Sequence, residues 1–181
     1  MEKEIKSNFE KLKIDTKRLL IRRIKNDDKE DFFEIFSDME TAINDGCRPY
    51  MEMDEKYEAD LKYLVSDEMH YAIELKECHK MIGIMHLTEI PERAVECYEL
   101  GYDIHPAFRR KGYATEAINA ITEYCFNVLD IEMLTASVYD WNKESANLLN
   151  KLGFIQEGKI HKAQKHYKFG VVDLLSFYKE R

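Results

Sequence analysis

The chain has 181 residues, of which 45% are hydrophobic and 34% are charged, a composition that suits one globular domain with a real core. Its 27 Lys and Arg residues against 35 Asp and Glu residues give a net charge of −8, which disfavours nucleic acid as a partner because phosphate binding needs a basic surface. The charged start lacks the apolar region of a signal peptide, and no apolar run reaches the roughly 18 residues of a membrane span, so we expect a cytoplasmic protein without a membrane partner.

The first part of the chain is predicted to form an arm, a strand and two helices. Apolar residues at Ile5, Phe9 and Leu12 are spaced for one face of a short helix, within an N-terminal arm of residues 1–15. A single domain is expected over residues 16–181. Its first elements are a strand, a helix, a long polar loop and a second helix, over Thr16–Ile24, Asn26–Asp38, Met39–Met53 and Asp54–Glu68.

The rest of the chain is dominated by predicted strands. Short breaks between the first three favour antiparallel hairpins, over His70–Leu75, Lys80–Ile90 and Glu96–His105. A long helix, a strand, a shorter helix and two strands follow, over Gly112–Leu129, Glu132–Asp140, Asn142–Leu152, Phe154–His161 and Lys168–Glu180. Hairpins followed by strand–helix–strand crossovers imply a mixed α/β sheet with helices on its faces. An exposed final strand could pair with a second copy of the chain, which makes a homodimer a further prediction.

The cysteine spacing argues against a metal site. The four cysteines lie far apart in the sequence and include no C-x-x-C pair, whereas a structural zinc site needs close pairs of ligands. We therefore expect free thiols and no bound metal.

A basic segment, "HPAFRRKGYATEA", interrupts the acidic sequence where the long helix begins. The first turn of a helix leaves backbone N–H groups without partners and carries partial positive charge. Gly112 lets a ligand approach the backbone closely. Together with Arg109, Arg110 and Lys111, these features predict a site for an anion such as a pyrophosphate. The alternative is a solvated basic loop.

Two blocks and an opening strand resemble the GNAT acetyltransferases, and in particular the RimJ/RimL-like group that acetylates the N-terminal amines of ribosomal proteins. The segment Arg109–Ala114 fits the family's phosphate loop, Q/R-x-x-G-x-G/A. A second block, Asp140–Gly158 ("DWNKESANLLNKLGFIQEG"), is similar to the N-x-x-S/A…LGF-x-x-EG segment of the family. The segment "TKRLLIRRI" near the start resembles the opening strand of the family. The resemblance implies the GNAT fold, with a mostly antiparallel sheet, one splayed strand pair and about four helices.

The resemblance also implies how acetyl-CoA is bound. The strand before the phosphate loop pairs with the pantetheine arm through Tyr102, Asp103 and Ile104, as an added strand would. The pyrophosphate sits on the backbone amides of Arg109, Arg110, Lys111, Gly112, Tyr113 and Ala114. Asn142 is expected to hydrogen-bond the same arm, to cap the following helix, or to do both.

For catalysis, the resemblance points to Ser145 and Glu99. Many relatives place a tyrosine at the position of Leu149 to protonate the departing thiolate, and Ser145 would take that role here. Glu99 is our first choice for the base that deprotonates the amine, ahead of Glu89, His86 and His166. The amide of Tyr102 or Asp103 would stabilise the developing oxyanion.

The predicted function is transfer of an acetyl group from acetyl-CoA to a primary amine, on a protein N-terminus or a small molecule. Because the usual tyrosine is missing, a non-catalytic acyl-CoA-binding module remains an alternative, and a general phosphate binder is a third. The acceptor pocket is expected between the Asp38–Met53 loop, the second helix and the last two strands. Acidic residues in that region favour a cationic acceptor, unless they are merely solvated: Asp45, Glu52, Asp54 and Glu55.

Overall fold

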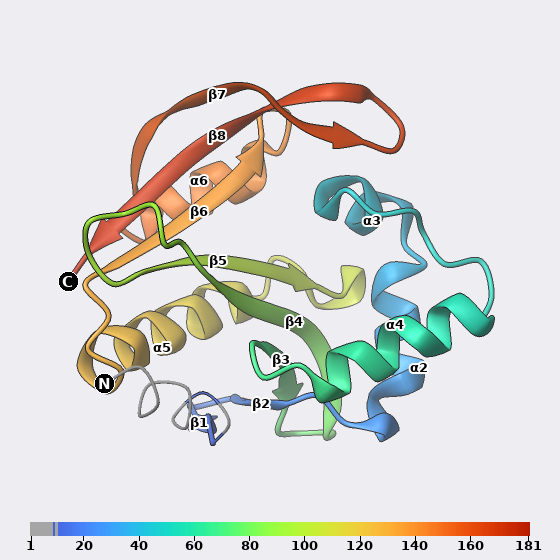
Figure 1. The fold of residues 1–181 in the computed structure, drawn as a ribbon. Coiled ribbons are helices and arrows are strands. Elements are labelled where there is room, and N and C mark those ends of the chain that lie inside the picture. The colour runs from blue at the N-terminus through green and yellow to red at the C-terminus, as the bar shows by residue number, and fades with distance from the viewer. Residues whose placement is uncertain (1–8, 10) are drawn as a thin grey trace.

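A computed structural model of the chain describes residues 9 and 11–181. One eight-stranded sheet runs through the molecule in the order β1-β2-β3-β4-β5-β6-β8-β7 (Figure 1). Its strands are β1 (Ile14–Asp15), β2 (Leu19–Arg23), β3 (His70–Leu75), β4 (Lys80–Glu89), β5 (Cys97–Ile104), β6 (Met133–Tyr139), β7 (Ile155–His166) and β8 (Gly170–Glu180). All neighbouring strands are antiparallel except β5 and β6. The predicted mixed α/β sheet is confirmed.

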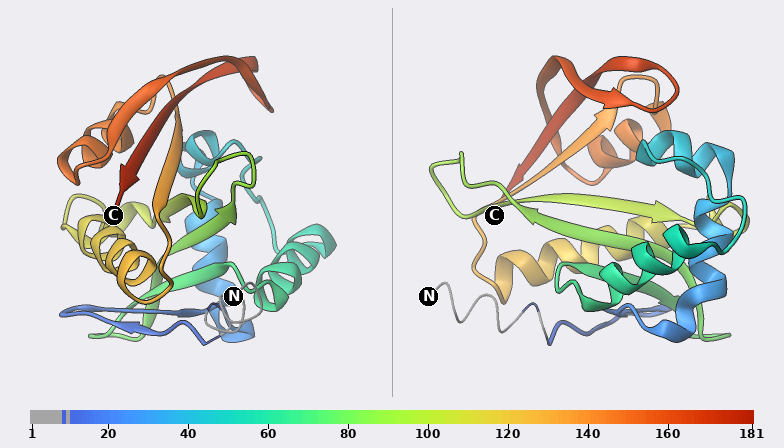
Figure 2. Two further views of the ribbon diagram at one scale, coloured as in Figure 1. Left: turned by 60° about the vertical axis from the view of Figure 1, so that its left-hand side comes forward. Right: turned by 45° about the vertical axis from the view of Figure 1, so that its right-hand side comes forward.

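The parallel pair β5 and β6 is short. Pairing begins at Cys97 with Met133 and ends at Glu99 with Thr135, although both strands continue. Beyond that point the β6–β8–β7 part of the sheet turns away from the β3–β4–β5 part, as Figure 2 shows. The expected splayed pair is therefore present, and it leaves one edge of β5 open.

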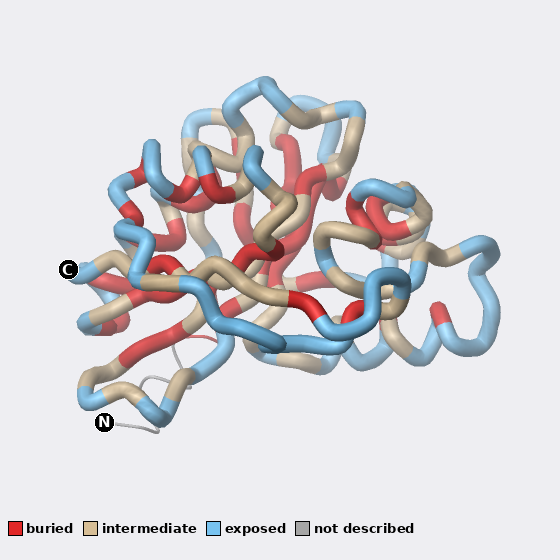
Figure 3. The backbone as a smooth tube through the Cα atoms, turned by 90° about the horizontal axis from the view of Figure 1, so that it is seen from above, coloured by how far each residue is buried: buried red, intermediate tan, exposed pale blue. Residues whose placement is uncertain are grey.

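Five α-helices cover the sheet within the described residues: α2 (Lys29–Phe36), α3 (Met39–Asp45), α4 (Glu55–Ser66), α5 (Tyr113–Asn127) and α6 (Lys143–Lys151). Two buried clusters fix them. The larger joins one face of the sheet to α5 and α6, through residues such as Ile118, Ile121 and Leu149. The smaller joins the other face to α2 and α4, through Phe32 and Leu61 among others. Figure 3 shows the buried backbone gathered along the central strands and the inner faces of the helices.

The helix α3 corrects the prediction of a loop over Met39–Met53. The side chain of Asp38 accepts a hydrogen bond from the Thr41 amide at 2.8 Å, which caps the N-terminus of the helix. Gly46 ends it with a φ of 91°, a left-handed conformation that glycine adopts without strain. Both signals stand in the sequence, but the helix is too short and polar to show a clear apolar period.

The last two strands also differ from the prediction. The strand β7 extends to His166, five residues beyond the expected end at His161, with register shifts after Gln156 and after Ile160. The final strand β8 lies between β6 and β7, so it has no free edge for a second copy. The free edge at this end of the sheet belongs to β7, and the argument for a homodimer through the final strand is wrong.

At the N-terminal end, Phe9 and Leu12 are buried in the larger cluster, and β1 pairs with β2. The rest of the helix predicted around Ile5 lies outside the described residues. The division into an arm and a domain stays a prediction. Among the described helices, none combines the length and apolar character needed to cross a membrane.

Candidate functional site

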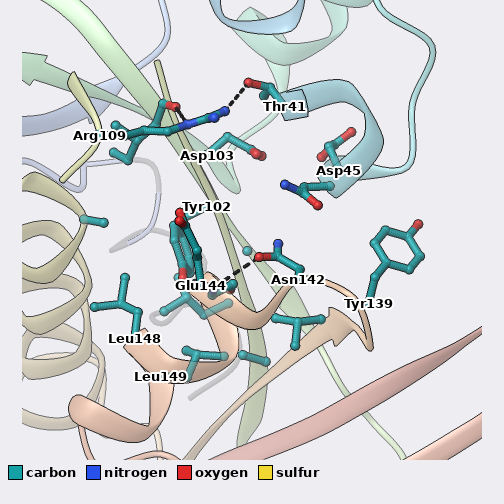
Figure 4. A pocket seen from close by; sticks show the side chains of 18 of the residues that line it. Thr41, Asp45, Tyr102, Asp103, Arg109, Tyr139, Asn142, Glu144, Leu148 and Leu149 are labelled. Carbon is teal, nitrogen blue, oxygen red and sulfur yellow. Dashed lines mark hydrogen bonds between the residues drawn. The ribbon is translucent and has the colours of Figure 1, made fainter. Parts of the chain in front are cut away.

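A cavity of about 820 Å³ occupies the opening between β5 and β6. It is lined from both faces of the sheet, because successive side chains of β5 point in opposite directions. We call the two parts the α5–α6 side and the α3 side. The α5–α6 side is formed by Tyr102, Gly112–Thr115, Asn142, Ser145 and Leu149. The α3 side is formed by Asp45, His86, Glu99, Gly101, Asp103 and Tyr139 (Figure 4).

The start of α5 has the geometry of an anion site. Arg110 and Gly112 have φ angles of 60° and 80°, so the chain turns sharply just before the helix. Gly112 is the N-cap residue, and no side chain caps the helix. The amides of Tyr113, Ala114 and Thr115 therefore lack the usual side-chain partner, and all three residues line the cavity.

The three basic side chains of this loop have different surroundings. Arg110 lines the cavity and forms an ion pair with Glu144 at 2.5 Å. Lys111 lies over the ring of Phe108 and does not line the cavity, although its carbonyl accepts a hydrogen bond from Arg18. Only Arg110 of these two could reach a ligand without a rearrangement.

Arg109 connects the two sides of the cavity. Its Nε donates to the Ile104 carbonyl at the end of β5, while its terminal nitrogens contact α3, with Thr41 at 2.7 Å and Glu40 at 2.9 Å. Figure 4 shows the guanidinium pointing at Thr41. The side chain thus fixes the phosphate loop to α3, and only its backbone remains for a phosphate.

The open edge of β5 presents alternate backbone groups. The amide of His105 bonds to Ile82 on β4 at 2.9 Å, and bonding in an antiparallel ladder recurs at every second residue. Asp103 and Gly101 therefore direct their amides at β4, whereas Tyr102 and Ile104 direct theirs into the opening, beyond the last position at which β5 pairs with β6. Of the two amides proposed for the oxyanion, the register favours that of Tyr102.

Two hydroxyl groups meet on the α5–α6 side. The Tyr102 hydroxyl lies 2.9 Å from Ser145 Oγ, and the Ser145 amide donates to Asn142 Oδ1 at 3.1 Å. Asn142 is therefore the N-cap of α6. Burial raises the pKa of Tyr102 to about 12, with the hydrogen bond to Ser145 acting in the opposite direction. The phenol is protonated at neutral pH and can act as a donor.

The sequence analysis did not single out this hydroxyl. Leu149, at the position where many relatives carry tyrosine, is fully buried in the core and offers no proton. Tyr102 brings a phenol to the same cavity from β5 instead of α6. The alternation of side chains along β5 could have indicated its position. Tyr102 and Asp103 are neighbours on this strand, so their side chains point to opposite faces, and that of Tyr102 points to the side of α5 and α6.

On the α3 side, Glu99 accepts a hydrogen bond from the Ser137 hydroxyl at 2.7 Å. His86 lies opposite Gly101, and a Cβ at Gly101 would stand only 2.0 Å from the imidazole. Burial lowers the pKa of His86 to about 4, so the ring is neutral. The absence of a side chain at Gly101 thus makes room for a neutral imidazole close to Glu99.

The two other candidate bases are placed elsewhere. Glu89 is exposed and does not line the cavity. His166 is buried; its Nε2 lies 3.0 Å from the Ile43 carbonyl, and its Nδ1 accepts from two backbone amides of the β7–β8 turn. With both ring nitrogens engaged, His166 holds that turn against α3.

Two carboxylates lie farther along the α3 side, at Asp103 and Asp45. Loss of water raises the pKa of Asp103 well above its ordinary value, and the nearby charge of Asp45 raises it further. Loss of water also raises the pKa of Asp45, an exposed residue at the end of α3, although the Cys47 thiol and His70 act in the opposite direction. Within the described residues, neither carboxylate forms an ion pair, and no cluster of three or more metal-ligating side chains occurs.

The family model for the acetyltransferase (GNAT) domain matches residues 18–155, most of the chain. The chain belongs to the GNAT acetyltransferase family. It is therefore an N-acetyltransferase, of a family that uses acetyl-CoA.

Individual relatives agree with this assignment. The uncharacterized N-acetyltransferase YoaA of Bacillus subtilis is 29% identical over 80% of the chain and 84% of its own length. The [ribosomal protein uS5]-alanine N-acetyltransferase of Escherichia coli is 30% identical, but over only 44% of the chain and 41% of its length. This short match does not establish the RimJ/RimL-like group.

Solved structures share the GNAT fold. A GNAT-family acetyltransferase from Bacillus anthracis superposes with a TM-score of 0.82 and 22% identity, over 93% of this chain and 98% of that one. The spermidine N-acetyltransferase of Vibrio cholerae, solved with CoA and spermine, gives a TM-score of 0.74 and 20% identity over 91% and 96%. At such identities the likeness concerns the fold alone.

Proposed function

We propose that this acetyltransferase moves an acetyl group from acetyl-CoA directly to a primary amine. The observation that carries the proposal is the hydroxyl pair of Tyr102 and Ser145, 2.9 Å apart, in the cavity that also contains Glu99. An acid and a base thus lie on opposite sides of the opening in which the pantetheine arm would pair with β5. CoA as a ligand of the V. cholerae structure supports the choice of acyl donor.

Each of these residues has one part in the reaction. The neutral amine nitrogen attacks the thioester carbonyl carbon, a C–N bond forms, and the Tyr102 amide donates to the oxyanion. The C–S bond then breaks, and Ser145 gives its proton to the departing thiolate while Tyr102 resupplies it. The proton lost by the amine passes to Glu99, directly or through water. Ser137, which donates to Glu99, holds that carboxylate in place.

The remaining assignments follow the geometry. The amides from Gly112 to Thr115 would hold the pyrophosphate, and Arg110 would add charge, while Lys111 and the Arg109 side chain support the loop. Asn142 serves as the helix cap and borders the same channel. The non-catalytic alternative depended on a missing phenol, and Tyr102 supplies one.

The acceptor is a primary amine on a protein N-terminus or a small molecule. The names of the similar proteins, a ribosomal-protein alanine acetyltransferase and a spermidine acetyltransferase, support both kinds.

A thiol-release assay with acetyl-CoA tests the proposal against N-terminal peptides, polyamines, aminoglycosides and amino sugars. We expect release with at least one class and a product heavier by one acetyl group in mass spectrometry. The variant Glu99→Gln should lower turnover, whereas Glu92→Gln, an exposed residue outside the cavity, should not. CoA that raises the melting temperature without thiol release from any amine would contradict transfer and favour the binding module.

A further inference from the structure

Three polar groups on the α3 side have no role in the chemistry proposed above. They are the carboxylates of Asp103 and Asp45 and the hydroxyl of Tyr139. Asp103 lies on β5, four residues beyond Glu99, and Asp45 ends α3. Figure 4 shows both carboxylates on the α3 side and the Tyr139 ring rising toward them from β6.

The Tyr139 hydroxyl is a buried group without a partner. The residue is 4% exposed, and within the described residues its oxygen forms no hydrogen bond. It lies against Gly46, where an added Cβ would stand 2.2 Å away. A buried hydroxyl normally finds a partner, so this one is placed for a ligand beside Asp45.

Within the described part of the chain, neither carboxylate forms an ion pair; the charges that act on them come from His70 for Asp45 and from Arg109 for Asp103. The nearest candidate for Asp103 is Arg109, but that guanidinium is engaged by Thr41, Asp38 and Glu40. Two carboxylates that share a cavity without an ion-paired cation repel one another, and here Asp103 is half-buried while Asp45 is exposed. An ammonium group placed between them would remove the repulsion and could also donate to the Tyr139 oxygen.

We propose that Asp45, Asp103 and Tyr139 bind a second positive charge of the acceptor, so that the preferred substrate is a linear diamine or polyamine. The inference rests on the proposed function, because the first amine must reach Glu99 to be acetylated. At about 3.3 Å per residue, Asp103 lies roughly 7 Å along β5 from Gly101 and roughly 13 Å from Glu99. The two nitrogens must therefore be separated by several methylene groups.

The test compares amines of matched length in the thiol-release assay with the whole protein. We expect kcat/KM for putrescine and spermidine to exceed that for butylamine by about 10- to 100-fold, the usual effect of a hydrogen-bonded charge. Ethylenediamine is too short to reach both positions and should behave like the monoamine. Equal rates for putrescine and butylamine would overturn the inference while leaving acetyl transfer intact.

Variants then locate the second charge. Asp103→Asn and Asp45→Asn should each reduce the ratio of kcat/KM for putrescine to kcat/KM for butylamine by about tenfold, and Tyr139→Phe should reduce it by less. Glu92→Gln is the matched control. An unchanged preference in both Asp variants would show that the pair merely shares a proton, and would overturn the site.

A binding measurement separates this inference from the proposed function. Putrescine is titrated calorimetrically into the CoA-saturated protein and into its Asp103→Asn variant. Binding that is lost in the variant, without thiol release from any amine, would support the cation site and contradict the transfer chemistry. Thiol release from peptides without any putrescine binding would support the transfer chemistry and contradict the cation site.

Discussion

The α5–α6 side of the cavity offers hydrogen-bond donors, whereas the α3 side offers acceptors. On the first side are the uncapped amides of Tyr113–Thr115 and the hydroxyls of Tyr102 and Ser145. On the second are carboxylates with raised pKa values at Asp45 and Asp103. An anionic acyl donor and a cationic acceptor can thus bind within one cavity, separated by a single strand. The net negative charge of the chain does not conflict with a pyrophosphate site, because the opposite charges face different ligands.

The largest effect is expected when the proposed acid is removed from the α5–α6 side. Tyr102→Phe should lower kcat by about 10²- to 10⁴-fold, the usual contribution of a general acid, with little change in the dissociation constant of CoA. Ser145→Ala should have a similar effect, and the double variant should cost no more than the larger single loss, because the two hydroxyls act in one chain. Steady-state kinetics and calorimetry measure these effects. Additive losses would show that the hydroxyls act independently.

A second change tests the connection between the two sides. Arg109→Gln removes the ion pairs with Asp38 and Glu40 while the loop keeps its backbone. In the unmodified protein, we expect bound CoA to lower the dissociation constant of the acceptor by a factor within the range of about 5 to 150 that is common for coupled sites. In the variant, this factor should be smaller. Calorimetry of the acceptor with and without CoA gives this factor. Arg93→Gln is the control, because Arg93 and its ion-pair partner Glu157 both lie outside the cavity lining.

A third change affects only the α5–α6 side. Gly112 has a φ of 80°, and a side chain in this left-handed conformation costs about 1–2 kcal/mol. Gly112→Ala should therefore weaken CoA binding by about tenfold and leave the preference between diamine and monoamine unchanged. A change in that preference would mean that the two sides are not separate binding regions.

The smallest expected effect concerns pH. The pKa of Tyr102 is about 12, above the ordinary value of about 10, so the phenol keeps its proton as the pH rises. At saturating substrate, kcat should not fall between pH 8 and about 10.5. A decline with an apparent pKa near 10 that disappears in Tyr102→Phe would show that the phenol titrates normally.

Much of the fold and of the α5–α6 side could be predicted from the sequence. The phosphate loop, its helix and Asn142 are contiguous motifs, and local chemistry determines their shape. The α3 side could not be predicted in the same way. Asp45 and Asp103 are brought together by tertiary packing, and the position of the Tyr102 hydroxyl depends on which face of β5 this residue occupies.

The errors in the fold have similar causes. The helix α3 depends on a cap at Asp38 and a glycine at its end, which are weak signals in a polar segment. The long strand β7 was underestimated because most of its side chains are exposed, so it lacks an alternating pattern. The place of β8 inside the sheet is a matter of topology, which periodicity does not report.

The interior position of β8 determines how this part of the molecule can come apart. The strand pairs with β6 on one edge and with β7 on the other, while β6 has only three paired positions with β5. Releasing β8 would therefore leave β7 without a partner strand and β6 with only its short pairing to β5, and Tyr139 would be among the residues that lose a partner. The β6–β8–β7 layer should open and close as one cooperative unit of local unfolding. The wall of the cavity that contains Tyr139 is consequently either complete or absent, with no stable half-formed state.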